Sequence, residues 1–129
     1  MSRDRRNRKW LPRPVLRKFQ MMYRRLVWGM DIRSSAVIAS TAYIDRTWPK
    51  GIHIGDEAII DEEAIILTHD MTRSVYRDTR IGCGCYVGPR AIILPGISVG
   101  DHATVAAGSV VTMDVPSGAI VAGSPAKRL

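Results

Sequence analysis

The chain has 129 residues, of which 46% are hydrophobic and 24% are charged, as expected for a single domain. Its formal net charge of +7 is unevenly distributed, because residues 1–25 hold ten Arg or Lys against one Asp, whereas the rest holds nine against eleven acids. Nucleic-acid readers usually spread basic residues over a folded face, so we expect no nucleic-acid partner. No apolar run approaches the roughly 20 residues that span a membrane.

Residues 1–30 are predicted to form a basic arm followed by an amphipathic helix. After Pro12 and Pro14, apolar residues recur at helical spacing: Leu16, Phe19, Tyr23, Leu26, Val27 and Met30. The accompanying basic residues suit a helix that lies on an anionic membrane surface, but the same stripe suits a helix that caps the following domain. Because the arm has no apolar stretch typical of a secretory signal, we expect a cytoplasmic protein. If the helix lies on a membrane rather than capping the domain, we expect peripheral contact with the inner face of that membrane.

Residues 31–129 are predicted to form a domain built from six-residue repeats. An aliphatic residue recurs at Ile81, Val87, Ile93, Val99, Val105 and Val111. An α-helix turns about 100° per residue, so it would scatter this series over several faces. A second, mostly small residue follows each aliphatic four places later, as at Cys85 and Ala91. Two inward positions per hexad predict one short strand and a corner, which is the pattern of a parallel β-helix.

The same spacing continues upstream, with two interruptions. Its aliphatic positions are Ile32, Ile38, Ile44, Ile54, Ile60, Ile66 and Val75. The phase breaks at residues 46–52 and again at residues 67–74, and loops that leave a regular scaffold commonly carry function. A column this thin needs capping or oligomerisation to be stable, so we expect a multimer.

The stretch from residue 81 to residue 128 resembles the hexapeptide-repeat acyltransferases, a family that includes galactoside, maltose, serine and polysaccharide O-acetyltransferases. The resemblance rests on Ile81-Gly82, Tyr86-Val87-Gly88, Pro95-Gly96, Val99-Gly100-Asp101, Ala106-Ala107-Gly108-Ser109-Val110-Val111-Thr112, Asp114-Val115-Pro116 and Ala122-Gly123-Ser124-Pro125-Ala126-Lys127. It implies an all-β, left-handed parallel β-helix, a homotrimer, and acetyl-CoA as co-substrate without a metal. The left hand comes from the resemblance alone, since parallel crossovers are generally right-handed.

His69 is the candidate catalytic residue. It lies in Thr68-His69-Asp70 at the start of the longer interruption, where the resemblance places the family's histidine base. A His with a pKa near 6.5 can take a hydroxyl proton during attack on a carbonyl, an effect worth about 10²–10⁴-fold. Asp70, or less favourably Asp61, is expected to orient the ring, although adjacent side chains on an extended segment point apart.

The other two histidines, His53 and His102, occupy outward hexad positions and are expected to be surface residues. They matter for one alternative, because γ-class carbonic anhydrases share the fold and bind zinc through three histidines. The sequence separations among His53, His69 and His102 do not match that pattern, in which two ligands lie close together in the chain. We therefore expect no metal site.

The resemblance also implies which residues bind coenzyme A in a cleft between neighbouring subunits. Ala107 and Thr112 are expected along the pantetheine arm, and Gly88 and Pro89 near the thioester. Lys127 or Arg128 is expected at a CoA phosphate, since basic side chains make strong charge-assisted hydrogen bonds to phosphate.

The function expected from these features is direct acetyl transfer to a sugar hydroxyl of a polysaccharide or lipid-linked glycan. The sequence leaves alternatives open. N-acetylation of an amino sugar is the nearest of these, followed by acetylation of an amino acid. A hexapeptide-repeat assembly module without catalysis is the alternative from a different class.

Overall fold

A computed structural model describes residues 14–129, with side chains described from residue 18 onward. One helix, α2 (Pro14–Leu26), precedes a series of very short strands. The strands are β1 (Asp31–Ile32), β2 (Val37–Ile38), β3 (Tyr43–Ile44), β4 (Ile52–Ile54), β5 (Ile59–Ile60), β6 (Ile65–Ile66), β7 (His69–Asp70), β8 (Val75–Tyr76), β9 (Thr79–Ile81), β10 (Tyr86–Val87), β11 (Ile92–Ile93), β12 (Ser98–Val99), β13 (Thr104–Val105), β14 (Val110–Val111), β15 (Ile120–Gly123) and β16 (Ala126–Arg128). A single 3₁₀ turn, η1 (Pro49–Gly51), precedes β4.

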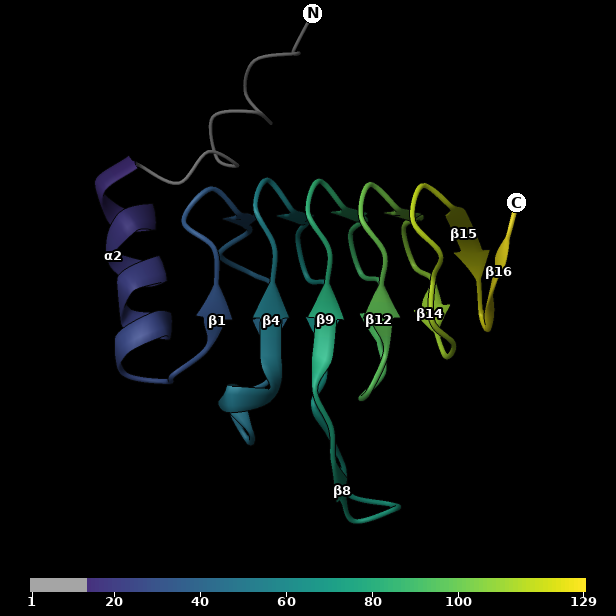
Figure 1. Cartoon of the computed structure of the whole chain (residues 1–129), viewed down its shortest axis with the longest axis horizontal. Helices are drawn as coiled ribbons and strands as arrows, with labels where there is room; N and C mark the ends of the chain where they lie inside the picture. The colour runs from purple at the N-terminus through teal and green to yellow at the C-terminus, as the bar shows by residue number, and fades with distance from the viewer. Residues whose placement is uncertain (1–13) are drawn as a thin grey trace, which may run out of the picture.

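Apart from the β7–β8 pair, the strands form three sheets that are the sides of a prism, and all of their pairings are parallel except that of β15 with β16. Sheet A has the order β1-β4-β9-β12, sheet B contains β2-β5-β10-β13-β15 with β16 at its end, and sheet C has the order β3-β6-β11-β14. Each coil visits A, B and C in turn. In Figure 1 the front strands run upward while the coils advance from α2 on the left to the C-terminus on the right, which is a left-handed winding. The predicted left-handed parallel β-helix is confirmed.

The core is a column of aliphatic and small side chains from the two inward positions of each hexad. All of the repeat positions named above from Ile32 to Ile66 and from Ile81 to Val111 are at most 3% exposed. The residues at the second inward position, including Ala58, Cys85 and Ala103, are at most 7% exposed. Burial of such apolar surface supplies about 25 cal/mol per Å², and each rung obtains it only from its neighbours. The hexad at Val75 is the exception, because this residue lies in a hairpin outside the prism.

The register between coils shows where the chain departs from the repeat. Ile92 pairs with Val110, which is 18 residues later and corresponds to three hexads. Tyr43 pairs with Ile65, 22 residues later, and Ile65 pairs with Ile92, 27 residues later. Two insertions therefore leave the prism between sheets C and A on successive coils, so they emerge side by side. Figure 1 shows η1 and the β8 hairpin projecting below the prism.

Helix α2 packs on the open end of the first coil through Met21, which is 7% exposed and joins the core with Met30. The predicted amphipathic helix is present, but it ends at Leu26, before the last predicted residues of the stripe. Phe19, Tyr23 and Leu26 are 57%, 45% and 77% exposed, and Val27 and Met30 follow the helix rather than belonging to it. The helix therefore caps the prism with one narrow edge and leaves most of its apolar side chains uncovered. Residues 1–13 of the predicted basic arm lie outside the described residues.

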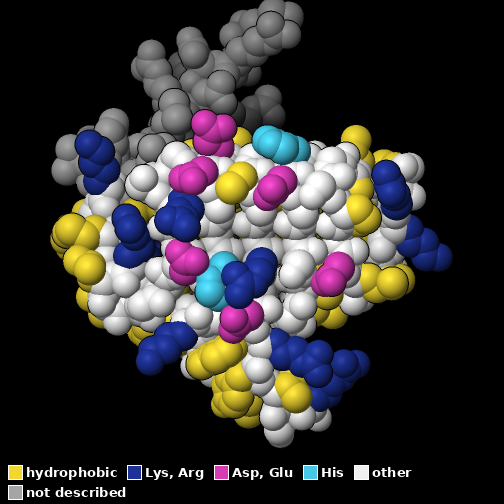
Figure 2. Space-filling model, viewed as in Figure 1, with side chains coloured by type: hydrophobic (Ala, Val, Ile, Leu, Met, Phe, Trp, Pro, Cys, Tyr) yellow, Lys and Arg dark blue, Asp and Glu magenta, His cyan; other side chains and the backbone are white. Residues whose placement is uncertain are grey.

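The surface seen in Figure 2 is mixed in charge over the prism, with acidic, basic and histidine side chains close together. Hydrophobic and basic side chains gather on the projecting hairpin, which contains Met71, Arg73, Tyr76 and Arg77. In the part of the chain from residue 14 onward, no helix combines the length and apolarity needed to cross a membrane.

Candidate active site

The longer insertion is an antiparallel hairpin whose base is fixed to the prism. Strands β7 and β8 pair His69 with Tyr76 and Asp70 with Val75. At the base, the Thr79 hydroxyl donates to the Leu67 carbonyl at 2.6 Å and accepts the Gly96 N–H at 3.1 Å. The Arg77 N–H donates to the Thr68 carbonyl at 2.9 Å. These bonds give the first residues of the hairpin, including His69, a defined position on a rigid support.

The shorter insertion packs against this hairpin. The ring centroids of Trp48 and Tyr76 lie 6.1 Å apart in an edge-to-face arrangement, the geometry that aromatic pairs prefer. The Thr68 hydroxyl donates to the Trp48 carbonyl at 2.9 Å. Gly51 allows the close approach, since a Cβ there would lie 2.5 Å from the Trp48 ring and 3.2 Å from the Arg77 carbonyl oxygen. The two interruptions of the repeat thus form one structural unit.

His69 is held at this junction by a buried carboxylate. Its ring Nδ1 forms a short hydrogen bond with Oδ2 of Asp45, whose side chain is 0% exposed, while the His69 side chain is 20% exposed. The same Asp45 oxygen accepts the N–H of Thr68 at 2.9 Å and that of His69 at 3.2 Å. Oδ1 accepts the Thr47 N–H at 2.9 Å. One carboxylate therefore fixes both the backbone and the ring of His69.

The electrostatics of Asp45 favour its charged form. Burial acts to raise the pKa of this carboxyl, but the hydrogen bonds from Thr68, His69 and Thr47 outweigh it and hold the pKa below its usual range. Because a carboxylate can only accept hydrogen bonds, Nδ1 of His69 carries the proton in the neutral ring. The lone pair is then on Nε2, which has no hydrogen-bond partner among residues 18–129. Such a nitrogen can act as a general base.

His69 lines a groove of about 520 Å³ beside the hairpin. The other lining residues are Leu67, Asp70, Met71, Arg73, Val75, Arg77, Leu94, Pro95, Ile97 and Thr112. Asp70, Arg73, Arg77 and Thr112 bring polar groups to this wall, and the remaining lining is apolar apart from His69. A groove that contains an oriented imidazole is a suitable place for proton transfer to or from a bound substrate.

The residues predicted to bind CoA lie in three places on one chain. Thr112 lines the groove with His69 at the corner between sheets C and A. Gly88, Pro89 and Ala107 come together at the corner between sheets B and C, where a Cβ on Gly88 would lie 2.7 Å from the Ala107 nitrogen. The Pro89 carbonyl accepts the Gly108 N–H at 2.9 Å. Lys127 and Arg128 are exposed on β16, at the C-terminal end of the prism.

Neither carboxylate expected to orient His69 does so in the structure. Asp70 accepts hydrogen bonds from the Thr72 N–H at 2.9 Å and from the Thr72 hydroxyl, and it lies 3.6 Å from Arg73. It thus stabilises the hairpin turn, because its side chain points away from its neighbour's, as the extended backbone dictates. Asp61 accepts the Tyr86 hydroxyl at 2.6 Å and raises the pKa of Tyr86 to about 12.

Asp45 was missed because it precedes His69 by 24 residues and looks like an ordinary polar residue after a strand. A signal was present. Ile44 pairs with Ile66, so Asp45 lies beside Leu67, where the longer insertion begins. The sequence pattern that indicates a partner for the histidine is therefore an acid that directly follows an inward aliphatic residue, one coil before a functional insertion.

His53 and His102 lie outside the groove, as the repeat positions predict. His53 lies between two carboxylates, with Nδ1 3.0 Å from Asp31 and Nε2 3.3 Å from Asp78. His102 is exposed at a turn with a φ of 58°. Among the residues that the structure describes, no group of three or more His, Cys, Asp or Glu side chains is placed to hold a metal ion.

Comparison with known proteins agrees with the observed fold. Residues 78–112 match the family described as bacterial transferase hexapeptide (six repeats). The chain is 36% identical over 98 residues to YvoF of Bacillus subtilis (strain 168), a provisionally named acetyltransferase, with 74% of this chain and 57% of the relative covered. It is 40% identical over 109 residues to serine acetyltransferase 2 of Arabidopsis thaliana, with 80% of this chain and 33% of the relative covered. The chain thus spans between a third and little more than half of these relatives.

Solved structures show the same architecture. The hexapeptide-repeat acetyltransferase VCA0836 of Vibrio cholerae superposes with a TM-score of 0.68 at 21% identity, covering 88% of this chain and 79% of that one. The maltose O-acetyltransferase of Clostridium difficile 630 gives a TM-score of 0.65 at 20% identity, with 100% and 76% covered. Residues 78–112 therefore carry the hexapeptide repeats described for bacterial transferases, and the chain has the fold of these solved acetyltransferase structures.

Proposed function

We propose that the protein is an acetyl-CoA-dependent O-acetyltransferase that acts on a sugar hydroxyl, with His69 as the general base. The observation that carries the proposal is the Asp45–His69 pair at the end of the groove, which leaves Nε2 of His69 free to accept a proton. The relatives named above support acetyl transfer as the common chemistry.

The proposed reaction is a direct transfer. Nε2 of His69 takes the proton of the acceptor hydroxyl as its oxygen attacks the thioester carbonyl carbon of acetyl-CoA. The tetrahedral intermediate then expels the CoA sulfur, and the proton held on His69 passes to that sulfur. The products are the acetyl ester and free CoA thiol. The Asp45 carboxylate stabilises the imidazolium that exists between the two proton transfers.

We propose that the CoA cleft forms between subunits of a homotrimer. The predicted CoA residues support this arrangement, because Gly88, Pro89 and Ala107 lie at a different corner of the prism from His69 and Thr112. A neighbouring prism can bring its own Gly88–Ala107 corner to the His69 groove. Lys127 and Arg128 at the end of the same prism are then available to a CoA phosphate.

The acceptor is proposed to be a polysaccharide or lipid-linked glycan in the cytoplasm. Helix α2 supports contact with the membrane where such glycans are assembled, because Phe19, Met22, Leu26 and Val27 are exposed beside Lys18 and Arg25. Flotation with anionic liposomes at low salt tests this part, and a protein that stays at the bottom of the gradient contradicts it.

The acetyl-transfer proposal is tested by release of free thiol from acetyl-CoA in the presence of a panel of glycan acceptors. Serine and an amino sugar belong in the panel, since relatives include proteins named serine and N-acetyltransferases. The His69→Gln variant should lower kcat by about 10²–10⁴-fold with unchanged CoA affinity by calorimetry. His102→Gln is the matched control at an exposed site. Near-normal turnover by His69→Gln overturns the assignment of the base, and the absence of CoA binding by the native chain favours an assembly module.

A further inference from the structure

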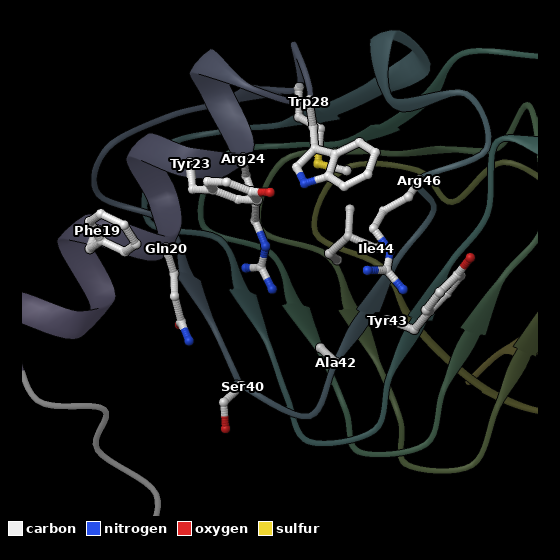
Figure 3. A pocket seen from close by; sticks show the side chains of 11 residues that line it. Phe19, Gln20, Tyr23, Arg24, Trp28, Ser40, Ala42, Tyr43, Ile44 and Arg46 are labelled. Atoms are coloured by element: carbon white, nitrogen blue, oxygen red, sulfur yellow. The ribbon is translucent and has the colours of Figure 1, made fainter.

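A second pocket lies between α2 and the first coil of the prism. It has a volume of about 420 Å³ and is formed by residues of the helix, of the segment after it, and of the chain around β3. Figure 3 shows Arg24 from α2 and Arg46 from the coil extending into this space from opposite walls. None of the residues proposed for acetyl transfer or CoA binding lines it, although Phe19 of the exposed face of α2 does.

Among the residues whose side chains the structure describes, those that line the pocket include two arginines and no acidic residue. Within the described part of the chain, neither Arg24 nor Arg46 forms an ion pair, whereas Arg73, Arg80 and Arg90 all do. Arg24 is half-buried, and this desolvation lowers the pKa of its guanidinium. Removing a charge from water is costly unless a partner compensates it, so the arrangement favours an anion that arrives from outside.

Aromatic rings hold one of these arginines in place. The guanidinium carbon of Arg46 lies 5.8 Å from the ring centroid of Trp28 and 6.0 Å from that of Tyr43. Tyr23 packs edge-on against Trp28 with centroids 6.4 Å apart. A guanidinium that contacts ring faces keeps the N–H groups at its edge available. Gln20 and Ser40 add further polar groups to the lining.

We propose that this pocket binds the phosphate group of a molecule whose adjoining part is apolar or aromatic. Two guanidinium groups that approach from different walls can reach different oxygens of a tetrahedral phosphate, and bidentate contact with phosphate is a common use of Arg. The rings of Trp28 and Tyr43 then contact the adjoining part of the ligand. Either a lipid phosphate or a soluble phosphate ester has this chemistry. The inference does not depend on acetyl transfer, although Arg46 directly follows Asp45 in the chain.

The test uses the full chain with CoA at saturating concentration, so that any CoA site is already filled. Phenyl phosphate is titrated in one arm, and phosphatidylcholine vesicles with and without phosphatidic acid are used in the other. Trp28 is in the pocket, so binding should change tryptophan emission. Comparison with a Trp28→Phe variant shows how much of this change comes from Trp28. Saturable binding of phenyl phosphate indicates a soluble phosphate ester, and binding only to phosphatidic acid vesicles indicates a lipid phosphate.

Arg24→Gln and Arg46→Gln should each weaken binding of the effective probe about tenfold or more, because each removes a charge-assisted contact. Arg33→Gln makes the same change of charge at an exposed site outside the pocket and should leave the affinity nearly unchanged. Thermal unfolding shows which variants retain the fold. The proposal is overturned when neither probe binds. It is also overturned when the folded Arg24→Gln and Arg46→Gln variants bind the probe as tightly as the native chain or as the Arg33→Gln variant does.

Discussion

At the scale of single residues, the site depends on a carboxylate that is fully removed from solvent. Asp45 accepts hydrogen bonds from three backbone N–H groups and from the ring of His69. A buried acceptor with this many partners is both a support for the loop and the group that selects the tautomer of the base. Support of the loop affects the stability of the fold, whereas selection of the tautomer affects the rate of acetyl transfer, so the two roles are measured by different experiments.

The Asp45→Asn substitution should reduce both the stability of the fold and the rate of acetyl transfer. An amide presents one oxygen where the carboxylate presents two, so buried N–H groups lose their acceptor at a cost of about 1–3 kcal/mol in the free energy of unfolding. The amide N–H₂ can also donate to Nδ1 of His69, which moves the ring proton to Nε2 and removes the base. We expect kcat to fall about 10²–10⁴-fold, as measured by thiol release. Glu62→Gln, at an exposed acid of the prism, is the control and should change neither quantity.

The stability difference between native protein and Asp45→Asn should depend on pH in a defined direction. The folded-state pKa of Asp45 is depressed, so its contribution is fully present above the unfolded-state pKa of about 4. The contribution is lost as the pH falls through the lower folded-state pKa. Denaturant unfolding from neutral pH downward measures it. A difference that grows on acidification contradicts the assigned cause.

At the scale of elements, the repeat pattern predicts the prism well but predicts the insertions poorly. Two inward positions per hexad suffice to place a residue such as Ile93 in the core, because each rung meets the same neighbours. The prediction failed at Val75, where the spacing fits by coincidence but the chain has already left the prism. Along α2 the spacing predicts the helix but leaves its packing open, and in the structure the helix touches the prism along one edge, buries Met21 and leaves Phe19 exposed. Periodicity shows which residues share a face and does not show how much of that face is covered.

The packing of the two insertions gives a test at this scale. Gly51→Ala should displace the Trp48 ring, because the new Cβ would lie 2.5 Å from it. The Trp48–Tyr76 contact then loosens, and we expect turnover to fall at least several-fold while the melting temperature changes little, since the prism is untouched. Hydrogen exchange at residues 69–76 should become faster. Lys50→Ala, in the same turn but exposed, should leave exchange in the hairpin unchanged, and equal exchange in both variants contradicts the model of one joined unit.

At the scale of the whole molecule, one prism carries only part of the proposed site. His69 and Thr112 lie at one corner, and Gly88, Pro89 and Ala107 lie at another. The sequence alone predicts that a narrow column needs partners, because so little of its core lies far from solvent. It does not predict how the corners meet, because this depends on the relative placement of separate chains.

Mixed oligomers test the sharing of sites. His69→Gln removes the base, and Ala107→Trp fills the expected CoA path at the other corner. Each variant alone should be nearly inactive. After the two are unfolded and refolded together at equal amounts, about a quarter of the clefts should combine an intact His69 with an intact Ala107 from its neighbour, so about a quarter of native activity should return. No recovery in oligomers shown by native mass spectrometry to be mixed contradicts a shared cleft.

The most direct measurement of the central proposal is a crystal structure with CoA bound. The account predicts that the CoA sulfur lies in the groove beside Nε2 of His69, with the pantetheine arm against the Gly88–Ala107 corner of an adjacent prism. A sulfur bound away from the His69 groove, with full occupancy and no second CoA site, would contradict it.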